Sequence, residues 1–427
     1  MSEIDLAFYD PMDPVVQQDP FHHYAALRRD APVFRHPKTG MYFVSRHETV
    51  RRVLADTDTF SSRMASAGTQ PRSKSLREEL RRIMQGVPPP VDTLLTADPP
   101  IQTRFRKATG RTISPQRIRG FAPAIREIAR ELLDAWPPGG RVDFMNSFAV
   151  PLPVRVIAHV LGMKPGLEAD IKRWSDDAVA AIGAALSDER RLEAARGVAE
   201  AQRMWLDEIE ERRTRPRDDI LSELVGVVIE DETGVMRPIT TSEVISILQQ
   251  LMVAGNETTT KLLNEIVRLL AEQPDEWRRL RDDRQRIAAV VEEGLRLSSP
   301  NQGLFRQVRV DTELEGVAIA AGSTLWVMFG SANRDERVFP DPDRFDPDRK
   351  NLREHLAFGH GAHFCIGAPL ARTETQIALE ELADRVETLR IAPGTELRYE
   401  PSFILRGLAA LEIEIKASHR QANVTQA

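Results

Sequence analysis

The chain has 427 residues, of which 41% are hydrophobic and 29% are charged, and its formal net charge is −6. This balance is typical of a soluble globular protein, and the negative charge argues against a general nucleic-acid binder. No window approaches the ~20 consecutive apolar residues of a transmembrane helix, and the acids and prolines from Met1 to Pro20 argue against a signal peptide or membrane anchor. A single cysteine excludes an intrachain disulfide and favours a reducing cytoplasm.

The N-terminal part of the chain predicts short elements and one long loop. A short helix is expected near Pro20-Phe21, residues 33–45 predict a hairpin, and 47–54 predict a further helix. Residues 61–97 are poorly patterned, which is typical of a functional lid or a disordered segment.

Helices dominate the middle of the chain. A basic helix at 101–107 is followed by long helices expected over 115–135, 150–161, 167–185 and 189–213. The strongest pattern runs from Thr240 to about Glu272, because Thr240 and Glu243 form a capping box and apolar positions recur at helical spacing. At ~1.5 Å per residue this helix spans ~45 Å, enough to cross the whole molecule.

The middle of that helix, residues 254–260, conflicts with its surroundings. It places a glycine, an acid and three threonines in a core helix, where glycine costs about 1 kcal/mol and threonine is a poor helix former. One interpretation is a tolerated local weakness or a solvent-facing turn. The other is function, since locally inconsistent sequence in a consistent element is where functional residues are expected.

The C-terminal part mixes helix with short strands. Arg286 to Leu297 predicts a helix in which Glu293 and Arg296 share a face. Strands are expected over 306–310, 317–319, 324–329 and within 397–415, and a Pro/Asp-rich meander over 339–345. With no βαβ alternation, the pattern predicts an α+β fold that is predominantly helical.

Cys365 lies in a glycine-rich turn just before an amphipathic helix. Unpaired backbone N–H groups and the helix dipole at such a place are expected to lower a thiol pKa and favour the thiolate, which binds metals and attacks electrophiles. A small buried hydrophobe and a nucleophile assisted by nearby His363 are two interpretations that the residues leave open. The third is a haem-iron ligand.

Four patches of the chain, in order, resemble signatures of the cytochromes P-450. They are Ala254-Gly255-x-Glu257-Thr258, the Glu293-x-x-Arg296 pair, the meander Pro342-Asp343-Arg344-Phe345 and the cysteine loop 358–367. The resemblance covers the C-terminal 40% or so of the chain and is closest to the soluble bacterial members. It implies one domain over residues 1–427, with the fold of the family: a triangular helical prism with small peripheral β-sheets and a long central helix over the haem.

The resemblance also implies roles for individual residues. Cys365 would ligate the iron of haem b, Phe358 would pack on the haem, and Gly367 would let backbone N–H groups approach the sulfur. Partners of the haem propionates would be Arg106, Arg306, His363 and Gln102, the last standing where many bacterial members have histidine. On the opposite face, Ala254 and Gly255 would admit O2 while Glu257 and Thr258 deliver protons. Glu293, Arg296 and Arg344 would form a buried structural charge network.

The implied activity is that of a monooxygenase, which inserts one atom of O2 into an apolar organic substrate with two electrons from a redox partner. C–H hydroxylation of a terpenoid, steroid, fatty acid or aromatic compound is expected, in a cytoplasmic monomer without a membrane anchor. The electron donor would be a ferredoxin or flavodoxin with its reductase, steered by Arg104, Lys107, Arg111 and Arg372. A peroxygenase using H2O2 and a non-catalytic haem-thiolate sensor are alternatives, and Glu257-Thr258 favours O2.

The substrate pocket is the least determined part of this expectation. Its lining is expected to come from residues 83–97, the 180s, Gln250, Val253, Ala254, Gly303-Leu304 and Phe403-Ile404. Gln250 and Gln302 are candidates for orienting a polar group of the substrate, or equally for being satisfied buried amides.

Overall fold

The computed structural model describes residue 6 and residues 9–63, 73–183 and 186–418. The helices of the N-terminal half are α1 (Pro14–Gln18), α2 (Phe21–Asp30), α3 (His47–Ala55), α4 (Lys74–Ile83), α5 (Ile101–Thr109), α6 (Pro115–Asp134), α7 (Pro151–Leu161), α8 (Glu168–Gly183), α9 (Asp188–Thr214) and α10 (Ile220–Val225). Those of the C-terminal half are α11 (Thr241–Glu272), α12 (Pro274–Asp282), α13 (Arg286–Ser298), α14 (Phe329–Ala332) and α15 (Ala368–Arg385). A π-helical turn, Met145–Ala149, leads into α7.

The strands form two small sheets and two hairpins. A five-stranded sheet has the order β1-β2-β10-β7-β3, and a three-stranded sheet has the order β11-β12-β4. The strands of these sheets are β1 (Val33–Arg35), β2 (Tyr42–Val44), β3 (Phe60–Ser61), β4 (Gly139–Asp143), β7 (Gly303–Val308), β10 (Thr324–Met328), β11 (Val386–Ile391) and β12 (Glu412–Ala417). The hairpins are β5–β6 (Val228–Glu230, Met236–Pro238) and β8–β9 (Thr312–Leu314, Val317–Ile319).

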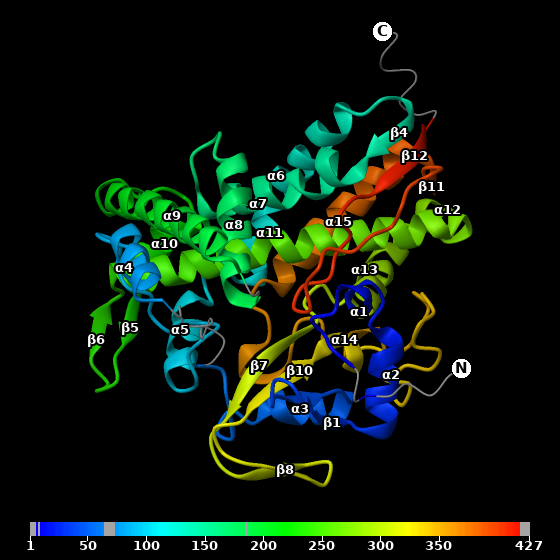
Figure 1. Ribbon diagram of the computed structural model, residues 1–427. Helices are drawn as coiled ribbons and strands as arrows, with labels where there is room; N and C mark the ends of the chain where they lie inside the picture. Colours follow the sequence, from blue (N-terminus) through cyan, green and yellow to red (C-terminus); the bar gives the residue numbers. More distant parts are fainter. Residues whose placement is uncertain (1–5, 7–8, 64–72, 184–185, 419–427) are drawn as a thin grey trace.

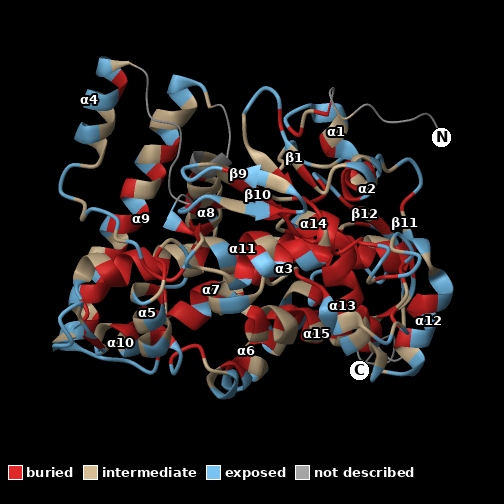
Figure 2. Cartoon of the chain, turned by 90° about the horizontal axis from the view of Figure 1, so that it is seen from below, coloured by how far each residue is buried: buried red, intermediate tan, exposed pale blue. Residues whose placement is uncertain are grey.

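Helix α11 is the axis of the molecule. Its 32 residues span about 48 Å at ~1.5 Å each, and the capping box of Thr240 and Glu243 is formed at its start, as predicted. The helix contacts α7, α8, α9, α13 and α15. Helices α6 to α10 lie on one side of α11 in Figure 1, and the five-stranded sheet with α2 and α3 lies on the other. Figure 2 shows buried residues concentrated along α11 and α14.

The sequence prediction was least accurate in the N-terminal part. The long helices begin and end within a few residues of their predicted bounds. Residues 61–97, expected to be an irregular loop, contain α4, which Ser73 caps by accepting a hydrogen bond from the Leu76 amide. Residues 64–72 of that segment lie outside the described part of the chain. Within the described residues, no helix combines the length and the apolar character needed to cross a bilayer.

The buried charge network behind the cysteine loop has a different third member from the one predicted. Glu293 and Arg296 are fully buried and paired, with Arg296 Nε 2.7 Å from Glu293 Oε2. The third cation is Arg349, whose Nε lies 3.1 Å from Glu293 Oε1. Arg344, predicted for that role, is 66% exposed and pairs with Asp346. Its contribution is its backbone carbonyl, which accepts hydrogen bonds from Arg296 and Arg349.

We predict that Arg349→Met lowers the free energy of unfolding by about 3–5 kcal/mol, because it leaves part of a buried carboxylate unpaired. The matched change Arg344→Met removes only an exposed ion pair and should stay within about 0.5 kcal/mol of the parent protein. Denaturant unfolding followed by circular dichroism measures both. Equal losses in the two variants would contradict this assignment.

Candidate active site

A cavity of about 280 Å³ lies between α11 and the cysteine loop. Its walls come from segments far apart in the sequence: the residues before and within α5, the middle of α11, strand β7, and residues 357–371. Leu304 and Arg306 both reach it because they are two apart on β7 and so point to the same face of the sheet. Cys365 lines the cavity together with Ala254, Gly255 and Thr258 of α11.

The cysteine loop has a shape that depends on glycine. Gly359 and Gly361 have φ values of +70° and +69°, which residues with a side chain rarely adopt. A Cβ on Gly361 would also lie 2.7 Å from the backbone oxygen of Leu54, so the loop packs directly against the end of α3. The Cys365 amide donates to the Phe358 carbonyl at 2.9 Å and closes the loop.

The pKa of the Cys365 thiol differs from the sequence expectation. Cys365 is half-buried and lines the cavity. Burial raises the thiol pKa, while hydrogen bonds from the Gly367 and Ala368 amides and the charges of Arg106 and Arg372 lower it. The net change is upward. The backbone amides near the start of α15 therefore do lower the pKa of the thiol, as expected, but desolvation outweighs their effect.

Cationic and polar groups at the cavity fit an anionic ligand. Arg306 is 3% exposed, and among the described residues its guanidinium donates one hydrogen bond, to the Phe305 carbonyl. Burial lowers its pKa to about 10. His363 bonds Ser62 through Nε2 at 3.0 Å, whereas its buried Nδ1 has no partner in the described chain. Burial and the charge of Arg306 lower the pKa of His363 to about 4, so it is neutral. Arg106 lines the same cavity.

These residues fit a haem. A cysteine sulfur on one wall suits the iron, and buried donors with unused capacity suit carboxylate groups such as propionates. Gln102 departs from the expectation, because it is absent from the cavity lining and its Nε2 donates to the Ala362 carbonyl at 2.7 Å. The contact of Gln102 is thus with the cysteine loop and not with the cavity.

On the α11 wall, the predicted acid and alcohol point in different directions. Thr258 lines the cavity, and its hydroxyl donates to the Ala254 carbonyl at 2.8 Å. Glu257 does not line the cavity: its side chain is 9% exposed and lies between Lys172 of α8 and Lys261 of α11, each 3.2 Å away. Burial raises the pKa of Glu257, but the two lysines lower it by a larger amount. The net shift of the pKa is therefore downward.

Gly255 has a packing function as well as a place in the cavity wall. A Cβ there would lie 3.0 Å from Ile157 Cδ1, so glycine permits the close approach of α7 to α11. The helix continues without a break through this segment, with Thr258 and Thr259 bonding back to carbonyls one turn earlier.

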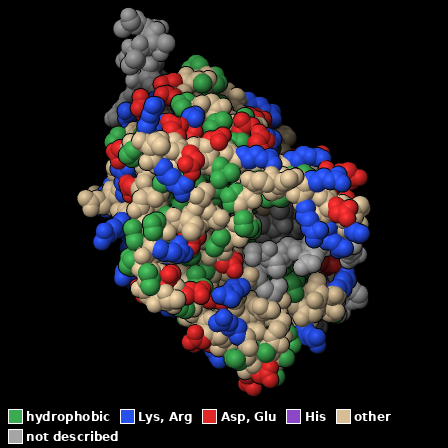
Figure 3. Space-filling view, turned by 90° about the vertical axis from the view of Figure 1, so that its left-hand side faces the viewer, with side chains coloured by type: hydrophobic (Ala, Val, Ile, Leu, Met, Phe, Trp, Pro, Cys, Tyr) green, Lys and Arg blue, Asp and Glu red, His purple; other side chains and the backbone are tan. Residues whose placement is uncertain are grey.

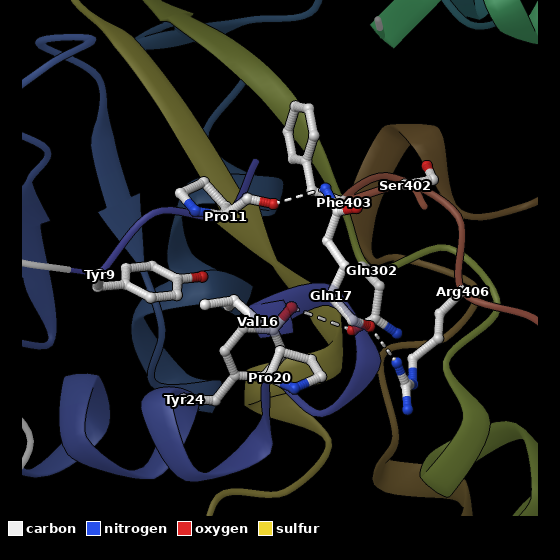
Figure 4. Close-up of a pocket in the computed structure, with 10 residues that line it drawn as sticks. All are labelled: Tyr9, Pro11, Val16, Gln17, Pro20, Tyr24, Gln302, Ser402, Phe403 and Arg406. Atoms are coloured by element: carbon white, nitrogen blue, oxygen red, sulfur yellow. Dashed lines mark hydrogen bonds between the residues drawn. The ribbon is translucent and has the colours of Figure 1, made fainter. Parts of the chain in front are cut away.

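The two glutamines expected to face the substrate are both engaged in structure. Gln250 reaches the cavity, but its oxygen accepts from the Leu95 amide and its nitrogen donates to Thr93, so it holds that loop in place. Gln302 lies outside the cavity, beside a small hollow near α1 and α2, where Tyr24 donates to its oxygen (Figure 4). Val253, Gly303, Phe403 and Ile404 are not among the lining residues, and the side chains of 181–185 lie outside the described set.

Two features of the site were not predicted. Asn301 lines the cavity, and its Oδ1 accepts from the Gly303 amide. Glu292 bonds Arg372 at 2.6 and 2.8 Å and His355 at 3.0 Å, and Arg372 lies over the Phe358 ring at 4.6 Å. Arg372 is therefore committed to the support of Phe358 and is not a free docking cation. Nothing in the spacing of Glu292 distinguishes it from a surface glutamate, so this role required the structure.

The comparisons with known proteins agree with this geometry. A family model described as Cytochrome P450 matches residues 187–389. Cytochrome P450 107B1 of Saccharopolyspora erythraea is 34% identical, over 94% of this chain and 96% of that protein. The vitamin D(3) 25-hydroxylase of Pseudonocardia autotrophica is 35% identical, over 93% of this chain and 94% of its own length. The solved structure of CYP109Q5 from Chondromyces apiculatus has a TM-score of 0.83 at 35% identity, covering 96% of this chain and 98% of that one.

The chain belongs to the cytochrome P450 family. Its fold is the α+β, predominantly helical fold predicted from the sequence, and the resemblance to bacterial members is confirmed. The protein is a cytochrome P450 monooxygenase, an oxidoreductase. The family implies haem whose iron is ligated by cysteine, and Cys365 is the one cysteine of the sequence.

The Glu292 carboxylate, which holds Arg372 over the Phe358 ring, makes the stability of the protein depend on pH. Although burial opposes it, pairing with Arg372 and His355 lowers the pKa of Glu292 to about 2. The stabilisation is complete only above about pH 5.5, where a glutamate of the unfolded chain, with a pKa of about 4.3, is ionised, and it is lost progressively as pH falls towards 2. We predict a shallower loss of stability in that range for Glu292→Gln, measured by thermal unfolding. The control Glu210→Gln, at an exposed position, should keep the parent slope, and equal slopes in all three proteins would contradict the assignment.

Proposed function

We propose that this protein is a haem-thiolate hydroxylase that inserts one atom of O2 into an apolar organic substrate, using two electrons from a redox partner. The observation that supports this most directly is the composition of one cavity. It combines the Cys365 sulfur, the Ala254–Gly255 groove with Thr258, and buried donors for carboxylates. When bound, haem b supplies the iron at which O2 is activated.

The residues of the cysteine side would hold and tune the cofactor. Cys365 would ligate the iron as thiolate, since coordination stabilises the anion that burial alone disfavours. The Gly367 amide would hydrogen-bond the sulfur, which adjusts the redox potential. Phe358, supported by Arg372, would pack against the haem and exclude water. Arg106, Arg306 and His363 would bind the propionates.

The residues of α11 would control protons. Thr258 presents its hydroxyl to the cavity and can accept a hydrogen bond there while it donates to Ala254. Glu257 would exchange protons with solvent on the outer side of the helix, because it reaches groups at the surface of α8 instead of the cavity. The carboxylate would therefore have to turn, or use water, to serve Thr258.

We also propose an apolar substrate of the steroid or terpenoid class. The lining of the cavity includes Leu94, Leu95, Leu251 and Leu304, and few of the lining residues carry a fixed charge. Among similar proteins, one is named for vitamin D(3), and CYP109E1 of Bacillus megaterium, 33% identical with a TM-score of 0.79, was solved with testosterone. Asn301 would offer its amide nitrogen to an acceptor on the substrate, since its oxygen is already used.

The electron donor would dock at α5 and the loop that follows it. Arg104, Lys107 and Arg111 are at the surface there, while Arg372 is engaged elsewhere. A small acidic ferredoxin or flavodoxin, with its reductase, complements this patch. On the face shown in Figure 3, which is the left-hand side of Figure 1, basic side chains are interspersed with acidic ones.

We further propose that residues 1–427 form one domain and that the protein works as a cytoplasmic monomer. Contacts between the two ends of the chain support the single domain. Strand β10 pairs in parallel with β2, and Arg406 donates to the backbone oxygen of Gln17 (Figure 4).

The ligand assignment has a spectroscopic test. We predict that the dithionite-reduced protein with carbon monoxide absorbs at the position that gives the family its name. Cys365→His should move that band to the position typical of histidine-ligated haem, because the thiolate is the origin of the unusual band. A parent spectrum of the histidine type would overturn the assignment of Cys365.

Proton control by Thr258 is tested by the coupling between electron use and product. We predict that Thr258→Ala consumes NADPH at a similar rate but forms several-fold less product and more H2O2. Thr260→Ala is the matched control, because Thr260 is buried on the same helix away from the cavity lining. Unchanged coupling in Thr258→Ala would remove Thr258 from the proton path and favour direct use of H2O2.

A further inference from the structure

We propose that Lys261 is a positioning residue, which anchors the Glu257 carboxylate to the loop 399–408 and thereby links proton delivery to one wall of the cavity. The proposal rests on the proposed role of Glu257 in proton delivery, but its structural part can be tested separately. The observation behind it is a buried lysine that bridges two carboxylates from different parts of the fold.

Lys261 lies one turn after Glu257 on α11 and is 8% exposed. Its Nζ is 3.2 Å from Glu257 Oε2 and 2.8 Å from Glu400 Oε2. Glu400, by contrast, is 47% exposed. The ammonium thus carries the connection from a buried carboxylate on the central helix to a loop at the surface. A lysine is almost never buried in this way unless it is paired, so both contacts matter for its placement.

The loop is shaped to receive the lysine. A Cβ on Gly407 would lie 2.3 Å from Lys261 Cγ and 2.9 Å from Cδ, so any side chain at 407 would displace the stem of the lysine. The Gly407 carbonyl in turn accepts from the Glu400 amide at 2.9 Å. The same short hairpin therefore provides the space for the aliphatic stem and the carboxylate for the ammonium.

The loop is also bonded to the cavity wall. The Gln302 amide donates to the Ile404 carbonyl at 2.7 Å, and the Arg406 amide donates to the Pro300 carbonyl at 2.9 Å. Pro300 and Asn301 line the cavity. A substrate that moves this wall would move the loop, and through Glu400 and Lys261 it would act on Glu257.

The charges around Glu257 indicate positioning and not proton transfer by the lysine. Lys261 and Lys172 lower the pKa of Glu257 against the effect of burial. Asp176 of α8 also faces Glu257 and bonds Lys172, and burial raises its pKa. The pKa of Lys261 is itself raised, since the two glutamates outweigh burial. A firmly held proton on Lys261 is not passed to a carboxylate that prefers to be ionised, so Lys261 holds Glu257 ionised and in place.

The experiment uses the haem-loaded full-length protein and two readouts that need no turnover. The first is infrared titration of the Glu257 carboxyl stretching band, identified by its loss in Glu257→Gln. In Lys261→Met we expect the midpoint to move to higher pH, because burial is then less opposed. Lys261→Arg should restore it. Glu400→Gln should not raise it, because the ammonium then pairs with Glu257 alone.

The second readout is hydrogen exchange of the amides in residues 399–408. Losing a charged hydrogen bond should accelerate exchange there about tenfold in both Lys261→Met and Glu400→Gln. Lys164→Met, which removes an exposed lysine elsewhere, is the control and should change neither readout. Gly407→Ala tests the same link from the other side, because it displaces the lysine stem and should also raise the midpoint.

The outcomes separate this proposal from the proposed function. An unchanged midpoint in both Lys261→Met and Gly407→Ala, or unchanged exchange of the loop in Lys261→Met and Glu400→Gln, would overturn the positioning role. Both readouts could change as expected while Thr258→Ala leaves the coupling of electron use to product intact. That result would support the link between Glu257 and the loop and contradict the proton path through Thr258.

Discussion

The ion pair between Glu293 and Arg296 is the interaction on which the site depends. Both side chains are fully buried, and such a pair is tolerated only when its remaining hydrogen-bonding groups are satisfied. Arg296 meets this condition by donating to the carbonyls of Asn333, Pro342 and Arg344. The Asn333 side chain then accepts from the Leu356 amide at 2.5 Å, just before the cysteine loop. One buried charge pair thus joins α13, the meander and the loop that presents Cys365.

The same physical rule separates the structural charges of this protein from those available to a ligand. Glu257, Glu292 and Glu293 are buried carboxylates, and each is bonded to at least two basic side chains. Arg306 is buried to a similar degree, yet its guanidinium donates only to one carbonyl within the described chain. A buried cation with so few partners is costly unless an anion completes its surroundings. This contrast supports the proposal that an acidic cofactor occupies the cavity.

Predictions from spacing succeeded where the residues that interact are close in sequence. Glu293 and Arg296 share a helix face, and the capping box of α11 lies within four residues. Predictions failed where a long side chain chooses among distant partners. Arg349 rather than Arg344 reaches Glu293, and Gln102 bonds the Ala362 carbonyl. Arginine and glutamine can direct their polar ends to many places, and only packing decides which one is reached.

The sequence alone was enough to determine the family, the mainly helical fold and the position of Cys365, because these depend on helical periodicity and on motifs of fixed local spacing. The tertiary structure decided which side of α11 each functional group faces. Adjacent residues on a helix point about 100° apart, so Glu257 and Thr258, neighbours in the chain, lie on different surfaces, one bonded to lysines and one open to the cavity. The partner of Lys261 was equally beyond sequence reasoning, since Glu400 is 139 residues away and is brought near only by the folding of the C-terminal loop against α11.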